Sequence, residues 1–199
     1  MTALKIILLT LCVFLVSCGP KIHEVFSPAE VQWSLEKGAT TLILHGQARN
    51  SLYPGGRDCE SAHDGMIFPD TKYFDAWYRV QTSGSHFAED ISSDARQYIR
   101  HASAEPGCIY TFRNVPAGNW RILLDISWYT SGVAGTGPYY GHSRHVPAGP
   151  GITSGRIHID GTETVIRKNF ISDEGLTTNS DHPFRMPRHQ AVLEPWAVP

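Results

Sequence analysis

The chain has 199 residues and a formal net charge of -2 at pH 7, with 17 basic and 19 acidic side chains. The basic residues form no stripe, which argues against nucleic acid as a partner. The 18 glycines, 13 prolines and 11% aromatic residues are typical of a loop-rich β protein rather than a helix bundle. The length fits one domain with a tail and leaves little room for a second domain.

The first residues have the features of a processed leader. Lys5 precedes a largely apolar stretch, residues 6–16, which has signal-peptide length and is too short to span a bilayer. It runs into Leu15-Val16-Ser17-Cys18-Gly19, which resembles the lipobox of bacterial lipoproteins. The resemblance implies that residues 1–17 are removed and that Cys18 carries acyl chains that anchor the protein to a membrane. The alternative is an ordinary secretory signal with a chance cysteine.

The residue after the cysteine bears on the location. In lipoproteins an aspartate at this position commonly retains the protein at the inner membrane, whereas this chain has Gly19. The resemblance therefore implies an outer-membrane lipoprotein of the bacterial cell envelope that faces the periplasm. Inner-membrane and surface-exposed locations remain open.

Two cysteines remain after this assignment. Of the 4 cysteines, Cys12 lies in the leader and Cys18 is the predicted lipid site. In the oxidising periplasm, Cys59 and Cys108 are expected to form a disulfide. Closing a loop of roughly 50 residues would stabilise the fold by about 4 kcal/mol. A redox or nucleophilic pair is the alternative, but the two cysteines lack a Cys-x-x-Cys spacing.

Residues 18–38 are expected to hold the lipid and one short helix. Ser27 is placed to cap the helix, Pro28 suits its first turn, and Glu30 completes a capping box. Gly38 is expected to end this segment.

From residue 39 the pattern changes to short apolar runs separated by turn residues. Between residues 88 and 102 the spacing of Ile91, Ala95 and Tyr98 instead predicts one short inserted helix. Asp160-Gly161 predicts a hairpin between the last two strands. The predicted strands are residues 40–48, 66–68, 75–80, 108–112, 120–128, 155–159 and 164–170.

One segment resembles a known family. Phe112-Arg113-Asn114-Val115-Pro116-Ala117-Gly118-Asn119-Trp120 resembles the F-x-N-(V/L)-P-A-G-x-Y segment of carboxypeptidase-regulatory-like domains. The resemblance extends over residues 39–171. It implies a mainly β fold, a seven-stranded-type prealbumin-like (transthyretin-like) β-sandwich with a short N-terminal helix and one short inserted helix. Such domains mostly serve as structural or adhesive modules. Pro106-Gly107-Cys108 replaces the usual acidic-glycine turn, which fits a disulfide at that turn.

Residues 172–199 are polar and rich in proline, and no regular element is predicted there. This extended tail either wraps its own domain or docks on a partner. Trp196 is the anchor in both interpretations, either buried on the parent domain or exposed as a binding residue.

Catalytic motifs are mostly absent from the sequence. It has no Gly-x-Ser-x-Gly elbow, no His-Glu-x-x-His and no phosphate loop. It ends in Trp196-Ala197-Val198-Pro199, unlike the Tyr-Arg-Gly-Ser end of the hydroxyisourate hydrolases that share the transthyretin fold. We therefore expect no enzymatic activity and no cofactor.

Residues 133–151 carry the candidate binding residues. Tyr139 and Tyr140, with Trp128 and Tyr129, are placed to form an aromatic platform for a glycan or a protein. Alternatively, Trp128 belongs to the core and the tyrosines cover loop backbone. His142 and His145, with His158, can offer three imidazoles to a metal, although ten histidines make chance proximity common.

The leading hypothesis is a non-enzymatic scaffold or binding module for another cell-envelope component. Its expected contact surfaces are the loop over residues 133–151 and the C-terminal tail. The alternatives are a metal-dependent hydrolase built on His142, His145 and His158, and a glycan-binding module that uses the aromatic loop.

Overall fold

The computed structural model describes residues 19–49, 57–58, 64–83, 88–133, 143–173 and 189–196. The helices in these parts of the chain are α2 (Pro28–Val31), η1 (Gln32–Leu35, a 3-10 helix), α3 (Lys72–Gln81) and α4 (Ser93–Arg96). The strands are β1 (Thr40–Arg49), β2 (Arg57–Asp58), β3 (Asp64–Pro69), β4 (Arg100–Glu105), β5 (Ile109–Val115), β6 (Gly118–Val133), β7 (Ser143–Ile159), β8 (Val165–Asp173) and β9 (His189–Pro195).

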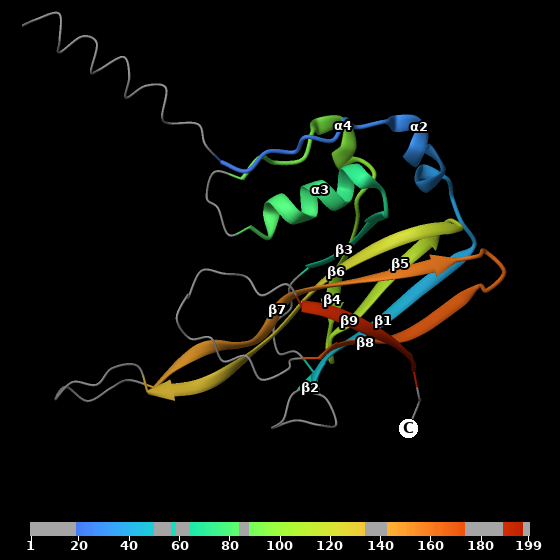
Figure 1. Cartoon of the computed structure of the whole chain (residues 1–199). Helices are drawn as coiled ribbons and strands as arrows, with labels where there is room; N and C mark the ends of the chain where they lie inside the picture. The colour runs from blue at the N-terminus through green and yellow to red at the C-terminus, as the bar shows by residue number, and fades with distance from the viewer. Residues whose placement is uncertain are drawn as a thin grey trace, which may run out of the picture.

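The strands form a barrel-like ring (Figure 1). Their order is β2-β1-β5-β4-β3-β6-β7-β9-β8, and β8 pairs back with β1, so eight strands close on themselves and β2 lies beside β1. The β1–β8 and β7–β9 pairs are parallel and the others are antiparallel. The expected mainly β fold is confirmed. The described residues form nine strands, however, whereas seven were expected.

The interior of the ring holds the main core. Alternate residues of each strand point to the same face, so the odd-even pattern of the sequence selects the inward side chains. Tyr110 lies among them and donates its hydroxyl to the backbone oxygen of Asp125 at 3.1 Å. Burial, with Asp125 and Asp64 nearby, raises the pKa of Tyr110 to about 12. Fully buried side chains of this core include Leu42, Leu44, Ile67, Trp120, Ile122, Leu124, Ile126 and Phe170.

A second apolar cluster lies outside the ring, between the helices and the outer face of β3 and β6. Phe68 points outward from β3, where its ring stacks on Phe74 at 5.2 Å and meets Trp77 edge-on at 5.3 Å. Leu123 of β6 belongs to the same cluster. Helices α2, α3 and α4 therefore form a layer on one side of the barrel (Figure 1).

The predicted strand over residues 75–80 is wrong, because these residues belong to α3. Tyr73, Phe74, Trp77 and Tyr78 are all buried on one side of this helix, at the spacing of a 3.6-residue period. Thr71 caps the helix by accepting a hydrogen bond from the backbone N–H of Phe74 at 3.5 Å. The helix predicted between residues 88 and 102 is confirmed as α4, so two helices are inserted among the strands instead of one.

The other six predicted strands are confirmed as parts of β1, β3, β5, β6, β7 and β8. The predicted hairpin at Asp160-Gly161 is wrong, because β9 lies between β7 and β8 in the sheet. The local turn does form: Gly161 has a φ of 82°, and the Asp160 carboxylate accepts bonds from Thr162 N and Oγ1, both at 2.8 Å. These bonds hold the pKa of Asp160 below its ordinary value. The turn therefore connects β7 to β8, two strands that are separated by β9 in the sheet.

The tail was expected to lack regular structure, which is wrong for residues 189–195. They form β9, which pairs with β8 from Ala191 to Pro195 and with β7 at Thr153 and Ser154. Ala191 and Leu193 pack against the main core. The strand is recruited by partners distant in sequence, which a local pattern does not reveal. Its end places the ring of Trp196 on that of His45, with centroids 5.4 Å apart.

The segment before β1 is fastened to the barrel at several points. Helix α2 begins at Pro28 as expected, but the side chain of Ser27 makes no capping bond, so the predicted capping box does not form. Arg100 donates to the backbone oxygens of Ser34 at 2.7 Å and Glu36 at 3.1 Å. Gly38 then donates to the backbone oxygen of Asn114 at 3.1 Å. The main chain at Gly38 therefore lies directly against the end of β5.

Gly38→Ala is expected to destabilise the protein by about 3 kcal/mol, since overpacking against backbone cannot be relieved by a rotamer change. A Cβ at this position would lie 2.0 Å from the backbone oxygen of Val115. Gly46→Ala is the matched control, because its Cβ would meet its nearest neighbours at 3.5 Å, an ordinary contact. Urea unfolding measures both, and equal losses for the two variants would contradict the tight approach at Gly38.

Candidate functional site

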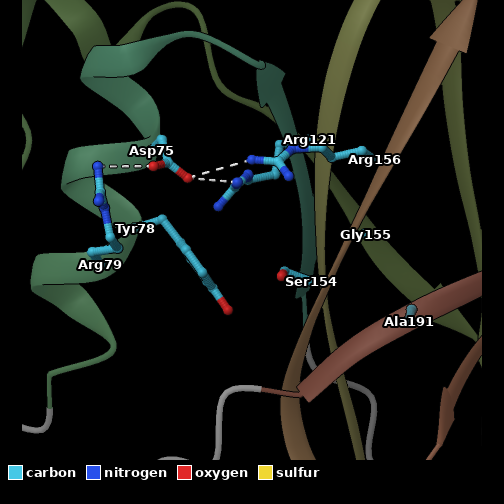
Figure 2. Close-up of a pocket in the computed structure, with 8 residues that line it drawn as sticks. All are labelled: Asp75, Tyr78, Arg79, Arg121, Ser154, Gly155, Arg156 and Ala191. Atoms are coloured by element: carbon cyan, nitrogen blue, oxygen red, sulfur yellow. Dashed lines mark hydrogen bonds and ion pairs between the residues drawn. The ribbon is translucent and has the colours of Figure 1, made fainter.

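A pocket of about 430 Å³ opens where α3 meets the outer surface of the barrel; we call it the α3 pocket (Figure 2). A neighbouring hollow of about 450 Å³ shares three of its residues and extends past the start of α3, where Glu24, Asp70, Thr71 and Lys72 line it. The α3 pocket is lined by Asp75, Tyr78 and Arg79 of α3, Arg121 of β6, Ser154, Gly155 and Arg156 of β7, and Ala191 of β9.

Secondary structure places the charged groups together. Asp75 and Arg79 are four residues apart, so they lie on the same face of α3. On the barrel, Arg121 of β6 pairs directly with Arg156 of β7. Like charges at directly opposite positions of a sheet destabilise it, so this pair requires an acidic neighbour.

Two carboxylates supply that neutralisation. Asp75 contacts all three arginines: Arg121 Nη2 at 2.6 Å, Arg79 Nη2 at 2.9 Å and Arg156 Nη2 at 3.5 Å. Asp70 lies 2.8 Å from Arg156 Nε and 3.5 Å from Arg121 Nε. We refer to these five side chains as the charge cluster.

The members of the charge cluster differ sharply in exposure. The Arg121 side chain is 6% exposed, whereas those of Arg79 and Arg156 are 60% and 58% exposed. The Arg121 guanidinium lies 4.9 Å from the ring centre of Tyr78, and its buried Nε makes no hydrogen bond. Arg121 is therefore fixed, while the outer two arginines present their ends to solvent.

The pocket offers several kinds of polar group in one small space. Guanidinium groups only donate hydrogen bonds, ionised carboxylates only accept them, and hydroxyls such as that of Ser154 do both. Figure 2 shows the Tyr78 ring extending from α3 towards Ser154. A ligand rich in hydroxyl groups can be recognised by such a set.

The residues predicted from the sequence lie elsewhere. His158 is exposed, and its Nδ1 lies 2.8 Å from Asn119 Oδ1. The backbone of His145 pairs with Ser131 in the β6–β7 ladder, and its side chain is outside the described part. Across the described ranges no three His, Cys, Asp or Glu residues are grouped to hold a metal. Tyr139, Tyr140 and His142 also fall outside the described residues, and neither His158 nor Trp196 lines the α3 pocket.

The predicted lipid and disulfide sites are only partly within the described chain. Cys108 is 3% exposed and disulfide-bonded. Cys59 lies outside the described residues, so the pairing of these two cysteines stays a prediction. Cys18 also lies outside them. Among the helices that the structure describes, none has the length and hydropathy of a membrane span.

Sequence reasoning missed the charge cluster, although two patterns pointed to it. Arg121 interrupts the apolar run of β6, and a buried cation needs a nearby acid. Asp75 and Arg79 have the i, i+4 spacing of a helical ion pair. The prediction of a strand over residues 75–80 hid the second pattern, because in a strand these two side chains would not meet.

Comparisons with known proteins show a likeness in structure. No protein-family model matches the chain, and no curated protein matches it. Among solved structures, it is similar to a "putative carbohydrate binding protein" from Pseudomonas aeruginosa, with a TM-score of 0.54 and 12% identity. The match covers 76% of this chain and 99% of that chain. At this identity the likeness shows a shared fold.

Asp75→Asn is expected to destabilise the protein by about 3 kcal/mol, since it leaves the buried Arg121 without its closest counter-charge. Asp90→Asn is the control: Asp90 pairs with Arg96 at 2.7 Å, but both side chains are exposed, at 69% and 60%. Surface pairs contribute little, so this variant should unfold almost as the parent does. Urea midpoints compare the two, and a small loss at Asp75 would show that Arg121 does not depend on it.

Proposed function

We propose that this chain is a carbohydrate-binding domain and that the α3 pocket is its binding site. The observation that carries the proposal is the charge cluster, four of whose side chains line the pocket with hydrogen-bond donors and acceptors. The fold shared with a "putative carbohydrate binding protein" supports it as an analogy.

The chemistry of sugars matches this pocket. Each sugar hydroxyl can donate and accept, so it can bridge a guanidinium such as that of Arg156 and a carboxylate such as that of Asp75. The volume of about 430 Å³ is within the range of small-molecule sites. The pair of Arg121 with Asp75 is in place before a ligand arrives, which lowers the ordering cost of binding.

The domain family and the membrane anchor are part of the same proposal. We infer a carboxypeptidase-regulatory-like domain of the prealbumin type, carried by a lipoprotein anchored through Cys18 at the outer membrane. The Glu89 main chain donates to Pro20 O at 3.1 Å, and Ile22 N donates to the Glu89 carboxylate at 2.8 Å. The chain is thus attached to the helical layer within two residues of Cys18. A lipid there would hold the domain close to the membrane surface.

Recognition of an envelope protein and metal-dependent hydrolysis stay predictions. Of the residues that motivated them, His158 and Trp196 are described, whereas Tyr139, Tyr140, His142, the side chain of His145 and most of the tail fall outside the described part of the chain.

Tyr78→Phe tests the proposed site, because it removes one hydroxyl and keeps the ring beneath Arg121. A neutral hydrogen bond contributes about 0.5–1.5 kcal/mol net, so affinity for a bound oligosaccharide should fall about 2- to 12-fold. Tyr98→Phe is the control, since its hydroxyl contacts Gln32 at 3.3 Å within the helical layer. Calorimetry of the purified protein against a panel of envelope oligosaccharides measures both. If nothing in the panel binds, the proposal fails.

The anchor has a separate test. Mass spectrometry of the protein isolated from membranes should find a chain that begins at an acylated Cys18. Cys18→Ser should abolish both cleavage and acylation and leave the protein with its leader attached. An unmodified and uncut start in the parent protein would contradict the lipoprotein assignment.

A further inference from the structure

We further propose, resting on the proposed carbohydrate binding, that the ligand is an acidic sugar whose carboxylate binds Arg156 and Arg79 at the mouth of the α3 pocket. Both guanidinium groups line the α3 pocket and the neighbouring hollow. A ligand carboxylate between them would face both spaces, with the rest of the sugar extending past Tyr78 towards Ser154.

The formal charge of the site indicates which ligand charge it would bind best. The charge cluster holds three arginines and two aspartates, so its formal charge is +1. In the neighbouring hollow, Lys72 and Glu24 cancel each other. One carboxylate brings the whole site to neutrality. A phosphate, with close to two negative charges, would exceed this balance beside two aspartates.

Unused donors point in the same direction. A guanidinium has five N–H groups in a planar fork that matches a carboxylate. Arg156 uses Nε on Asp70 at 2.8 Å and Nη2 on Asp75 at 3.5 Å, and Arg79 uses Nη2 on Asp75 at 2.9 Å. Both side chains are more than half exposed, so part of each guanidinium stays accessible outside these pairs. These ends can donate to an incoming carboxylate while the existing pairs persist.

The three arginines therefore have two different roles. Arg121 is buried between Asp75 and the Tyr78 ring, so it positions Asp75 and does not need to touch the ligand. Arg156 and Arg79 are more than half exposed, and exposed ion pairs are easily rearranged. The ligand can therefore engage the outer arginines without disturbing the buried pair.

The test compares three sugars on the full, purified protein by calorimetry. They are a glucuronate-containing oligosaccharide, the same oligosaccharide with its carboxyl group reduced to an alcohol, and its counterpart with a sugar phosphate. The acidic form is expected to bind at least about tenfold more tightly than the reduced form, as one charge-assisted pair predicts. The phosphate should bind less tightly than the carboxylate, and added salt should weaken only the charged ligands.

Variants locate the carboxylate. Arg156→Gln is expected to remove most of the preference for the acidic form, and Arg156→Lys to restore only part of it, since an ammonium lacks the planar fork. Arg167→Gln is the matched control, because Arg167 is an exposed arginine on β8 and does not line the pocket. Unchanged thermal midpoints show that each variant is folded.

The possible failures are distinguishable. Equal binding of the acidic and reduced sugars would overturn the acidic-ligand inference and leave carbohydrate binding intact. Tighter binding of the phosphate would overturn it in favour of a phosphorylated sugar. If Arg156→Gln and Arg79→Gln both keep the full preference for the acidic sugar over the reduced one, the carboxylate does not bind at these two arginines. Failure of all three sugars to bind, together with the wider panel, would overturn the proposed function as well.

Discussion

The arrangement around the α3 pocket depends on one buried cation, Arg121. It sits on the outer face of β6 with 6% of its side chain exposed, where an unpaired charge would cost several kcal/mol. Asp75 of α3 meets it at 2.6 Å, which fixes the rotation of the helix about its own axis. The stacking of Phe68 on Phe74 supplies the apolar burial that holds α3 to β3. The ion pair orients the helix, and the aromatic contacts attach it.

The same constraint produces the pocket. Because Arg121 and Arg156 are paired across β6 and β7, their mutual repulsion has to be relieved by acids from outside the sheet. Asp75 and Asp70 reach them from α3 and from the turn before it, so at this edge helix and sheet are joined by charges, beside the apolar packing of Phe68 on Phe74. Polar groups that are held apart in this way leave a hollow between them. A recognition surface therefore follows from the way the helical layer is docked.

Features that depend on neighbouring residues are predictable from the sequence, whereas features that depend on residues far apart in the chain are not. Strand β1 is evident because residues 40–47 alternate between buried and partly buried, and β6 is evident from its short apolar run at Ile122-Leu123-Leu124. Helix α3 was missed because its β-branched and aromatic residues mimic a strand locally, and only the spacing of Phe74 and Trp77 reveals the helix. Strand β9 and the charge cluster are contributed by segments far apart in the chain. No local pattern brings Arg121, Asp75 and Ala191 together, so the site required the fold.

The closing strand links the site to the integrity of the ring. Ala191 of β9 lines the α3 pocket, and within the described residues β9 joins β7 through two residue pairs, at Thr153 and Ser154. Ser154 also lines the pocket, so a bound ligand would contact both sides of this short junction. Any molecule that binds the closed arrangement and not the open one stabilises the closed form by mass action. A ligand bound at this junction would therefore stabilise the pairing of β9 with β7.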